Sequence, residues 1–233
     1  MERIVLNDRE YIIYSCESCE KKPEKIIFVM VDKSDEAMAE EIIYADDISE
    51  SKLMLVFCLI DNWNRDLSPW KAPAVFGKED FGGEGKCTLG NITDVCIPYL
   101  IESYNIDTAE SRFFICGYSL AGLFALWAVY NTDVFKGAVS CSGSLWFKGF
   151  EEYIKGRKLP EDCSIYLSLG DREHKTKNPV MSRVKLVTEY AYKLYGNTPE
   201  VKNLKLEWNE GNHFNNPDER LKKGILWVIE NVP

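Results

Sequence analysis

Histidine is scarce in this sequence: 233 residues contain only His174 and His213. The eight cysteines are scattered, and Cys16 and Cys19 form the one pair at the spacing of a metal or redox site. Because no second pair completes a zinc site, we interpret this pair as part of a solvated turn rather than as two ligands. Without a ligand cluster, we expect the protein to need neither a metal nor an organic cofactor.

The sequence also lacks a basic stretch. Its formal net charge is −9 at pH 7, and its neighbouring lysines form only short groups, at Lys21-Lys22, Lys175 with Lys177, and Lys222-Lys223. Nucleic acids and anionic membrane surfaces are recognised through clustered positive charge. We therefore expect neither of them as a partner.

Long apolar runs are absent as well. The first ten residues contain early acidic residues and an apolar run of only three, Ile4–Leu6, which is unlike a signal peptide. No segment approaches membrane-spanning length. We therefore expect a cytoplasmic protein whose cysteines stay mostly as thiols. Cys58, Cys116, Cys141 and Cys163 lie in or beside apolar runs and are expected to be small buried hydrophobic residues.

Short apolar runs alternate with longer helical patterns, which is typical of an α/β protein with a mostly parallel sheet covered on both faces. With 45% hydrophobic residues, the chain can bury a large core, and its length fits one domain over residues 1–233. The predicted strands are Arg3–Leu6 and Glu10–Ser15 as an opening hairpin, Ile26–Val31, Leu53–Ile60, Arg112–Cys116, Ala138–Cys141, Ser164–Leu169 and Leu204–Trp208. The predicted helices are Glu36–Asp46, Ile92–Tyr104, Leu120–Tyr130, Leu145–Lys155, Pro179–Tyr195 and Pro217–Asn231.

One segment near the middle of the chain combines an apolar strand, a tight turn with a serine at its tip, and an apolar helix. Small residues flank Ser119, with Gly117 two positions before it and Ala121 and Gly122 after it. This layout is typical of a nucleophile elbow, in which the turn is so sharp that its neighbours nearly collide. We predict that Ser119 is an exposed nucleophile and that the backbone N–H of Leu120 can bind an oxyanion.

Other readings of this turn fit less well. A phosphate-binding loop would need lysine and then serine or threonine after Gly122, where the chain has Leu123 and Phe124. A dinucleotide-binding turn needs glycine in place of Ser119. The remaining alternative is an ordinary strand-to-helix turn of an α/β protein.

A serine nucleophile needs a base, and the base needs a carboxylate partner. His213 follows the last predicted strand, where the chain order of serine, acid and histidine requires the base, and we prefer it to His174. Asp171 and Glu173 both follow the strand Ser164–Leu169 and are both eligible as the acid. Glu173 is preferred because two residues of turn after the strand let the chain fold back toward the histidine, but Asp171 stays open.

The longest irregular stretch runs from Asp61 to about Leu89. Long loops without secondary structure are uncommon in compact domains and tend to be functional. This one leaves the strand that we expect to lie next to the nucleophile strand, so we expect it to cover the serine. The mechanism requires a second oxyanion donor just past that strand, and the N–H of Trp63 or of Asn62 would supply it.

Several motifs together resemble an esterase family of α/β-hydrolases that includes siderophore (enterochelin-type) esterases, feruloyl and acetylxylan esterases, and S-formylglutathione hydrolases. They are Asn62–Trp70, Phe81–Gly83, Ile97–Tyr99, Gly117–Ala125, Ser168–Glu173 and Gly211–His213. The resemblance covers about Leu53 to His213, and its one departure in the elbow is Ala121 where glycine is commonest. It implies the α/β-hydrolase fold, Ser119 and His213 as nucleophile and base, and an acid within residues 171–173.

We therefore expect a serine hydrolase that cleaves a small carboxylic ester through an acyl-enzyme intermediate. The alternatives are an acyltransferase that uses the same triad, and a non-catalytic binding protein that retains the fold. The oligomeric state and the natural substrate stay open. Candidate substrate-binding residues are the aromatic residues Trp70, Tyr118, Trp146 and Phe214, with Trp63 and Phe147 as further candidates.

Overall fold

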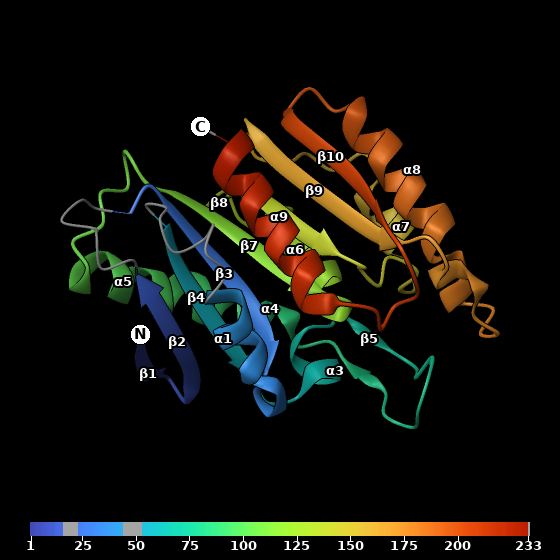
Figure 1. Ribbon diagram of the computed structural model, residues 1–233, viewed down its shortest axis with the longest axis horizontal. Coiled ribbons are helices and arrows are strands. Elements are labelled where there is room, and N and C mark those ends of the chain that lie inside the picture. Colours follow the sequence, from blue (N-terminus) through green and yellow to red (C-terminus); the bar gives the residue numbers. More distant parts are fainter. Residues whose placement is uncertain (16–22, 44–52, 233) are drawn as a thin grey trace.

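The computed structural model describes residues 1–15, 23–43 and 53–232. Figure 1 shows a twisted central sheet with helices on both faces, and the strand order is β1-β2-β4-β3-β7-β8-β9-β10. The strands are β1 (Glu2–Leu6), β2 (Arg9–Ser15), β3 (Lys25–Asp32), β4 (Leu53–Ile60), β7 (Arg112–Tyr118), β8 (Phe135–Cys141), β9 (Cys163–Gly170) and β10 (Val201–Asn209). The β1–β2 hairpin and the β2–β4 pair are antiparallel, and all other neighbours are parallel. The predicted fold class is confirmed.

The central strands are apolar on both faces because both faces are covered. Along β3, Phe28 and Met30 belong to one packed cluster, while Val29 and Val31 belong to a cluster on the opposite face. Successive side chains of a strand point to opposite sides, so a strand buried on both sides is a nearly continuous apolar run. This explains why the sequence predicts the parallel strands well.

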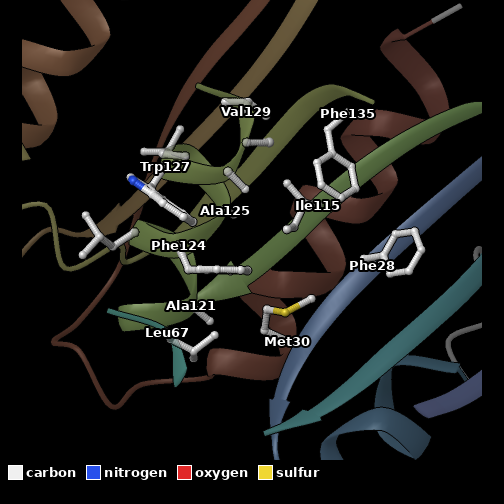
Figure 2. Packing of buried hydrophobic residues seen from close by; sticks show 14 of the residues in the cluster. Phe28, Met30, Leu67, Ile115, Ala121, Phe124, Ala125, Trp127, Val129 and Phe135 are labelled. Carbon is white, nitrogen blue, oxygen red and sulfur yellow. The ribbon is translucent and has the colours of Figure 1, made fainter. Parts of the chain in front are cut away.

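The helices divide between the two faces. Packed with the first cluster are α4 (Gly85–Gly90), α5 (Ile97–Ser103), α6 (Leu120–Val129), α7 (Phe150–Ile154) and α8 (Val184–Gly196). Packed with the second are α1 (Ala37–Ile43) and α9 (Pro217–Asn231). Every residue of α6 is buried, and Figure 2 shows Phe124 extending from the helix toward Ile115 and Met30 of the neighbouring strands. A helix that is apolar all round is expected in such a buried place.

Three predicted helices differ in their bounds. The helical structure predicted over Ile92–Tyr104 begins earlier, at α4, and passes through a π-helical turn, Asn91–Cys96, into α5. The prediction over Leu145–Lys155 is wrong in its first half, because Gly149 has a φ of 85° and α7 begins only after it. In the prediction over Pro179–Tyr195, a 3-10 turn, Met181–Arg183, precedes α8.

Two sequence predictions fall partly or wholly outside the described residues. The end of the helix predicted over Glu36–Asp46 lies there, and so does the Cys16 and Cys19 pair. The four cysteines expected to be buried, Cys58, Cys116, Cys141 and Cys163, are buried and free.

The segment from Asp61 to Leu89 contains more structure than predicted. It holds α3 (Trp63–Asp66), the short strand pair β5 (Lys71–Ala72) and β6 (Phe81–Gly82), and most of α4. Its expected position beside the nucleophile strand is also wrong, because β3 lies between β4 and β7. The segment still reaches α6: Leu67 lies in the same packed group as Ala121 and Phe124 (Figure 2). A parallel sheet has all its carboxyl ends at one edge, so a loop can cover a strand that is not its neighbour.

The tight contact between Gly117 and Ala121 gives a first prediction. A Cβ atom at Gly117 would lie 2.5 Å from the Cβ and the carbonyl carbon of Ala121. Because both partners belong to the turn itself, we expect Gly117→Ala to lower the free energy of unfolding by about 1–3 kcal/mol, measured by urea denaturation.

Gly90→Ala is the matched control for this substitution. Gly90 is helical, with φ −60° and ψ −40°, and the nearest atom to an added Cβ is Asp94 Oδ2 at 3.7 Å. Alanine there should leave the stability unchanged or raise it by up to about 1 kcal/mol. Equal stability of the Gly117→Ala variant and the wild type would contradict the tight turn.

Candidate active site

Ser119 lies in a strained turn between β7 and α6. Its φ and ψ are 58° and −120°, a conformation that costs a non-glycine residue on the order of 1–3 kcal/mol. The surroundings hold it in place: the Ser119 N–H donates to the carbonyl of Cys141 at 3.0 Å, and the Ser144 N–H donates to the Ser119 carbonyl at 2.9 Å. The turn therefore places the serine hydroxyl at the carboxyl edge of the sheet, as an elbow would.

Three side chains from distant parts of the chain meet at this edge. Ser119 Oγ lies 3.0 Å from His213 Nε2, and His213 Nδ1 lies 2.8 Å from Glu173 Oε2. These residues follow β7, β10 and β9, respectively. Both distances are in the hydrogen-bond range. A histidine that carries its proton on Nδ1 would donate to Glu173 and leave Nε2 free to accept the Ser119 proton.

The two carboxylates that the sequence left open lie in different places. Glu173 is buried and contacts His213. Asp171 is about half exposed, and its Oδ1 accepts the Gly211 N–H at 2.8 Å, so it binds the backbone of the histidine loop instead. His174, the second histidine, is half-buried, and no hydrogen bond joins it to Ser119 or Glu173 within the described residues.

The second oxygen of Glu173 is saturated with donors. Oε1 accepts from the Gly170 N–H at 2.7 Å, from Ser142 Oγ at 2.7 Å and from Arg220 Nη1 at 2.8 Å. Burial raises the pKa of Glu173, but the bond and charge of His213 and the bonds from Gly170 and Ser142 outweigh it, so the net pKa is lowered. The carboxylate is thus kept ionised.

Sequence reasoning missed Ser142 and Arg220. Ser142 could have been found, because it follows a predicted strand whose carboxyl end lies at the site edge. Arg220 lies within the predicted last helix, where nothing distinguishes it from a surface arginine, yet it is 2% exposed.

Two backbone N–H groups at helix starts are candidates to bind an oxyanion. Leu120 and Trp63 are the first residues of α6 and α3, and the N–H of a first helical residue has no acceptor within its own helix. The Asn62 N–H, the alternative from the sequence, donates to Asp66 Oδ2 at 3.3 Å and is therefore engaged. This favours Trp63 over Asn62.

A cavity of about 800 Å³ begins at Leu145, one residue after Ser144, and neither Ser119 nor His213 is among the residues that line it. Ser144 Oγ is 3.4 Å from Ser119 Oγ, and the residues that follow Ser144 enter the cavity wall. The wall is mainly apolar, with Phe81, Leu145, Trp146, Phe147 and Val187, and it also has polar groups from Glu151, Asn178 and Arg183. Such a mixture is typical of small-molecule sites.

The aromatic candidates occupy different positions around the site. Trp146 lines the cavity, as does Phe147. Trp70 supports that wall from behind, with Nε1 donating to the Lys148 carbonyl at 2.9 Å and its ring 5.8 Å from that of Phe147. The remaining two flank His213, with ring centroids 5.3 Å away for Tyr118 and 5.4 Å away for Phe214, which is 85% exposed. Trp63 is half-buried and packs against the core.

The described part of the chain contains no group of three or more histidine, cysteine, aspartate or glutamate side chains that could hold a metal ion. None of its helices is long and apolar enough to cross a membrane.

Comparison with known proteins places the fold. No family model matches the chain. The uncharacterised protein YbbA of Bacillus subtilis is 29% identical over 132 residues, which are 55% of this chain and 53% of that protein. The match thus spans about half the length of the relative.

Solved structures are similar over nearly the whole chain. An IroE-like serine hydrolase from Shewanella oneidensis has a TM-score of 0.78 at 17% identity, over 95% of this chain and 76% of that one. A siderophore hydrolase, EstA, from Aspergillus nidulans has a TM-score of 0.73 at 15% identity, over 100% and 94%. An S-formylglutathione hydrolase from Agrobacterium tumefaciens has a TM-score of 0.63 at 16% identity, over 100% of both chains. The chain has the α/β-hydrolase fold, as predicted.

The lowered pKa of Glu173 predicts how stability depends on pH. A carboxyl whose pKa is lower in the folded state stabilises the fold above its ordinary pKa, and this contribution is lost as the pH falls through the folded pKa. We expect Glu173→Gln to lower the free energy of unfolding at pH 7 by on the order of 3–5 kcal/mol, because it leaves the buried Arg220 charge unpaired. The difference from the wild type should shrink as the pH falls from about 5 to 3.

Urea denaturation of both proteins across this pH range measures the difference. Asp171→Asn is the matched control, since Asp171 is about half exposed and its removal leaves no buried charge unpaired. A difference between wild type and Glu173→Gln that stays constant down to pH 3 would contradict the assigned pKa direction.

Proposed function

We propose that this protein is a serine hydrolase that cleaves a small carboxylic ester through an acyl-enzyme intermediate. The observation that carries the proposal is the hydrogen-bonded chain from Ser119 through His213 to Glu173, with distances of 3.0 and 2.8 Å. This order of groups matches a nucleophile, its base and the carboxylate that orients the base. A binding role would need none of these contacts.

In the first half of the reaction, Ser119 Oγ attacks the ester carbonyl carbon while His213 Nε2 takes the hydroxyl proton. The carbonyl oxygen becomes an oxyanion, which the N–H groups of Leu120 and Trp63 stabilise. The tetrahedral intermediate collapses, the bond to the alcohol oxygen breaks, and His213 gives its proton to the leaving alcohol. The acyl group is then bound to Ser119.

In the second half, water replaces the alcohol. His213 Nε2 takes a proton from the water as its oxygen attacks the acyl carbon, and a second oxyanion forms in the same place. Its collapse breaks the bond to Ser119 Oγ, which regains the proton from His213. Glu173 stays ionised throughout, holding the Nδ1–H tautomer and stabilising the imidazolium that forms twice in each cycle.

The cavity that begins at Leu145, directly after Ser144, is an argument for a small substrate. Its apolar wall, with Trp146 and Phe147, suits an aromatic or short acyl group or a compact alcohol. Trp70 would stiffen that wall, while Tyr118 and Phe214 would border the substrate on the His213 side. The names of two similar structures, a siderophore hydrolase and an S-formylglutathione hydrolase, are consistent with ester chemistry on small molecules. We expect the protein to act in the cytoplasm, without nucleic acid or membrane.

The nucleophile assignment is tested with Ser119→Ala. We expect ester hydrolysis to fall by on the order of a millionfold, since the variant lacks the attacking oxygen. His213→Ala should be as damaging, because the two residues act as a unit. The measurements are turnover of p-nitrophenyl acetate and labelling by a fluorophosphonate probe.

Ser103→Ala is the control for this test, since Ser103 is exposed on α5, away from the site. It should keep wild-type turnover and labelling. A folded Ser119→Ala protein that retains a tenth of the wild-type rate would overturn the assignment. A wild type that is not labelled would favour a non-catalytic binding protein, and faster product formation with an added alcohol would favour an acyltransferase.

The size of the cavity and its surroundings predict the acyl preference. The segment from Asp61 to Leu89 mixes aromatic residues with charged ones, and several of the charged side chains are exposed. An enzyme that works at a lipid interface would instead present a broad apolar face. We expect kcat/KM for p-nitrophenyl esters to be highest for short or aromatic acyl groups. A steady rise from two to twelve carbons, or activation by emulsified triglyceride, would contradict this.

A further inference from the structure

A buried arginine from α9 contacts every loop that supplies the proposed catalytic side chains. Arg220 is 2% exposed, and its two terminal nitrogens make five hydrogen bonds. Nη1 donates to Glu173 Oε1 at 2.8 Å, Ser142 Oγ at 2.8 Å and Tyr118 Oη at 3.1 Å, and Nη2 donates to the carbonyls of Asn212 at 2.9 Å and Glu210 at 3.3 Å.

These five acceptors come from the carboxyl ends of four neighbouring strands. Tyr118 is the last residue of β7 and precedes the nucleophile, Ser142 follows β8, and Glu173 follows β9. Glu210 and Asn212 follow β10. One guanidinium therefore ties together segments that are up to 94 residues apart in the sequence. A planar group with several fixed donors suits such a junction better than a lysine.

The loop that carries His213 depends on these backbone contacts. Asn212, Phe214 and Asn215 in this loop are exposed, so apolar burial contributes little to holding it. Two successive carbonyls are held instead: that of Asn212 by Arg220, and that of His213 by the Tyr118 hydroxyl at 2.7 Å.

The Tyr118 hydroxyl has a double role in this arrangement. Burial raises the pKa of Tyr118 to about 12, so the hydroxyl keeps its proton and donates it to the His213 carbonyl. The same oxygen accepts from Arg220 Nη1. Arg220 thus acts on both carbonyls, directly on one and through Tyr118 on the other.

The same guanidinium binds only one of the two Glu173 carboxylate oxygens and leaves the other for His213. Oε1 is bound by Arg220, Ser142 and Gly170, whereas Oε2 faces His213. The carboxylate cannot rotate without breaking these three bonds, which are all charge-assisted because Glu173 is ionised. There is no spare room either, because a Cβ on Gly170 would lie 3.0 Å from both Arg220 Nη2 and Glu173 Oε1.

We infer that Arg220 is a positioning residue, which sets the orientation of both His213 and Glu173 toward Ser119. The inference rests on the proposed hydrolase function. If it holds, loss of these bonds should slow the chemical step while substrate binding stays unchanged, because Arg220 lies behind the side chains that face the substrate.

The test compares Arg220→Lys and Tyr118→Phe with the wild type on p-nitrophenyl acetate. Lysine keeps the charge but cannot make the forked contacts, so we expect kcat to fall by on the order of 10- to 100-fold, as for a small misplacement of reacting groups. Loss of the single Tyr118 hydroxyl should lower kcat about 2- to 10-fold. KM should change by less than about twofold in both, since Tyr118→Phe keeps the ring that borders the substrate and loses only a hydroxyl bound to His213 and Arg220.

Ile225→Val is the matched structural control. Ile225 is buried in α9 and has no polar atom in its side chain, so its substitution weakens helix packing while kcat should stay the same. A second readout needs no substrate: the low-field proton NMR resonance of the Nδ1–H bonded to Glu173 should shift or broaden in Arg220→Lys and Tyr118→Phe and persist in Ile225→Val. If Arg220→Lys does not fold, the kcat and the Nδ1–H resonance of Tyr118→Phe provide the test.

Unchanged kcat and an unchanged resonance in the folded variants would overturn the positioning role, and so would a raised KM at constant kcat. These outcomes require that the wild type is labelled by a fluorophosphonate at Ser119. A wild type that is not labelled would overturn the proposed function and this inference with it. The two failures are therefore distinguishable.

Discussion

The close approach of Gly117 to Ala121 is the constraint on which the rest of the site depends. This turn is so tight that the buried helix α6 starts directly after the buried strand β7. It leaves one side chain, that of Ser119, at the sheet edge. The strained backbone of Ser119 persists because β8 and the loop after it bind its N–H and its carbonyl. Once the turn is fixed, the first N–H of α6 points to the same edge, so the proposed nucleophile and the proposed oxyanion donor are positioned by one local feature.

The remaining groups are positioned by topology. In a parallel sheet the carboxyl ends of all strands lie at one edge, so loops that are far apart in sequence meet there. Glu173 and His213 follow β9 and β10, and Trp63 follows β4, which is not even a neighbour of β7. This arrangement explains how the segment after β4 reaches α6 although β4 is not a neighbour of β7.

Sequence reasoning reached the parts of the site that have local signals. Small residues around Ser119 and the position of His213 after the last strand are such signals. Glu173 differs from Asp171, and Trp63 from Asn62, in which neighbour takes each hydrogen bond, and such contacts leave no signal in the sequence. The Gly211 N–H donates a hydrogen bond to the Asp171 carboxylate, and the Asn62 N–H donates one to the Asp66 carboxylate. Arg220 was missed because a buried arginine in a helix has the same sequence pattern as an exposed one.

Two buried carboxylates, each paired with arginine, hold opposite sides of the site. Glu173 with Arg220 holds the histidine side, while Asp66, bound by Arg9 and Arg65, fixes the first turn of α3, where the Trp63 N–H lies. Replacing a whole buried ion pair by apolar side chains is often neutral for stability, so geometry is the better reason for the presence of these pairs. Burial raises the pKa of Asp66, but the hydrogen bonds from Arg65 and Arg9 outweigh this effect, so its net pKa is lowered. The pKa of Glu173 is lowered as well. Both carboxylates therefore stabilise the fold at neutral pH, and we expect acid that protonates them to loosen the segments that carry His213 and Trp63 together.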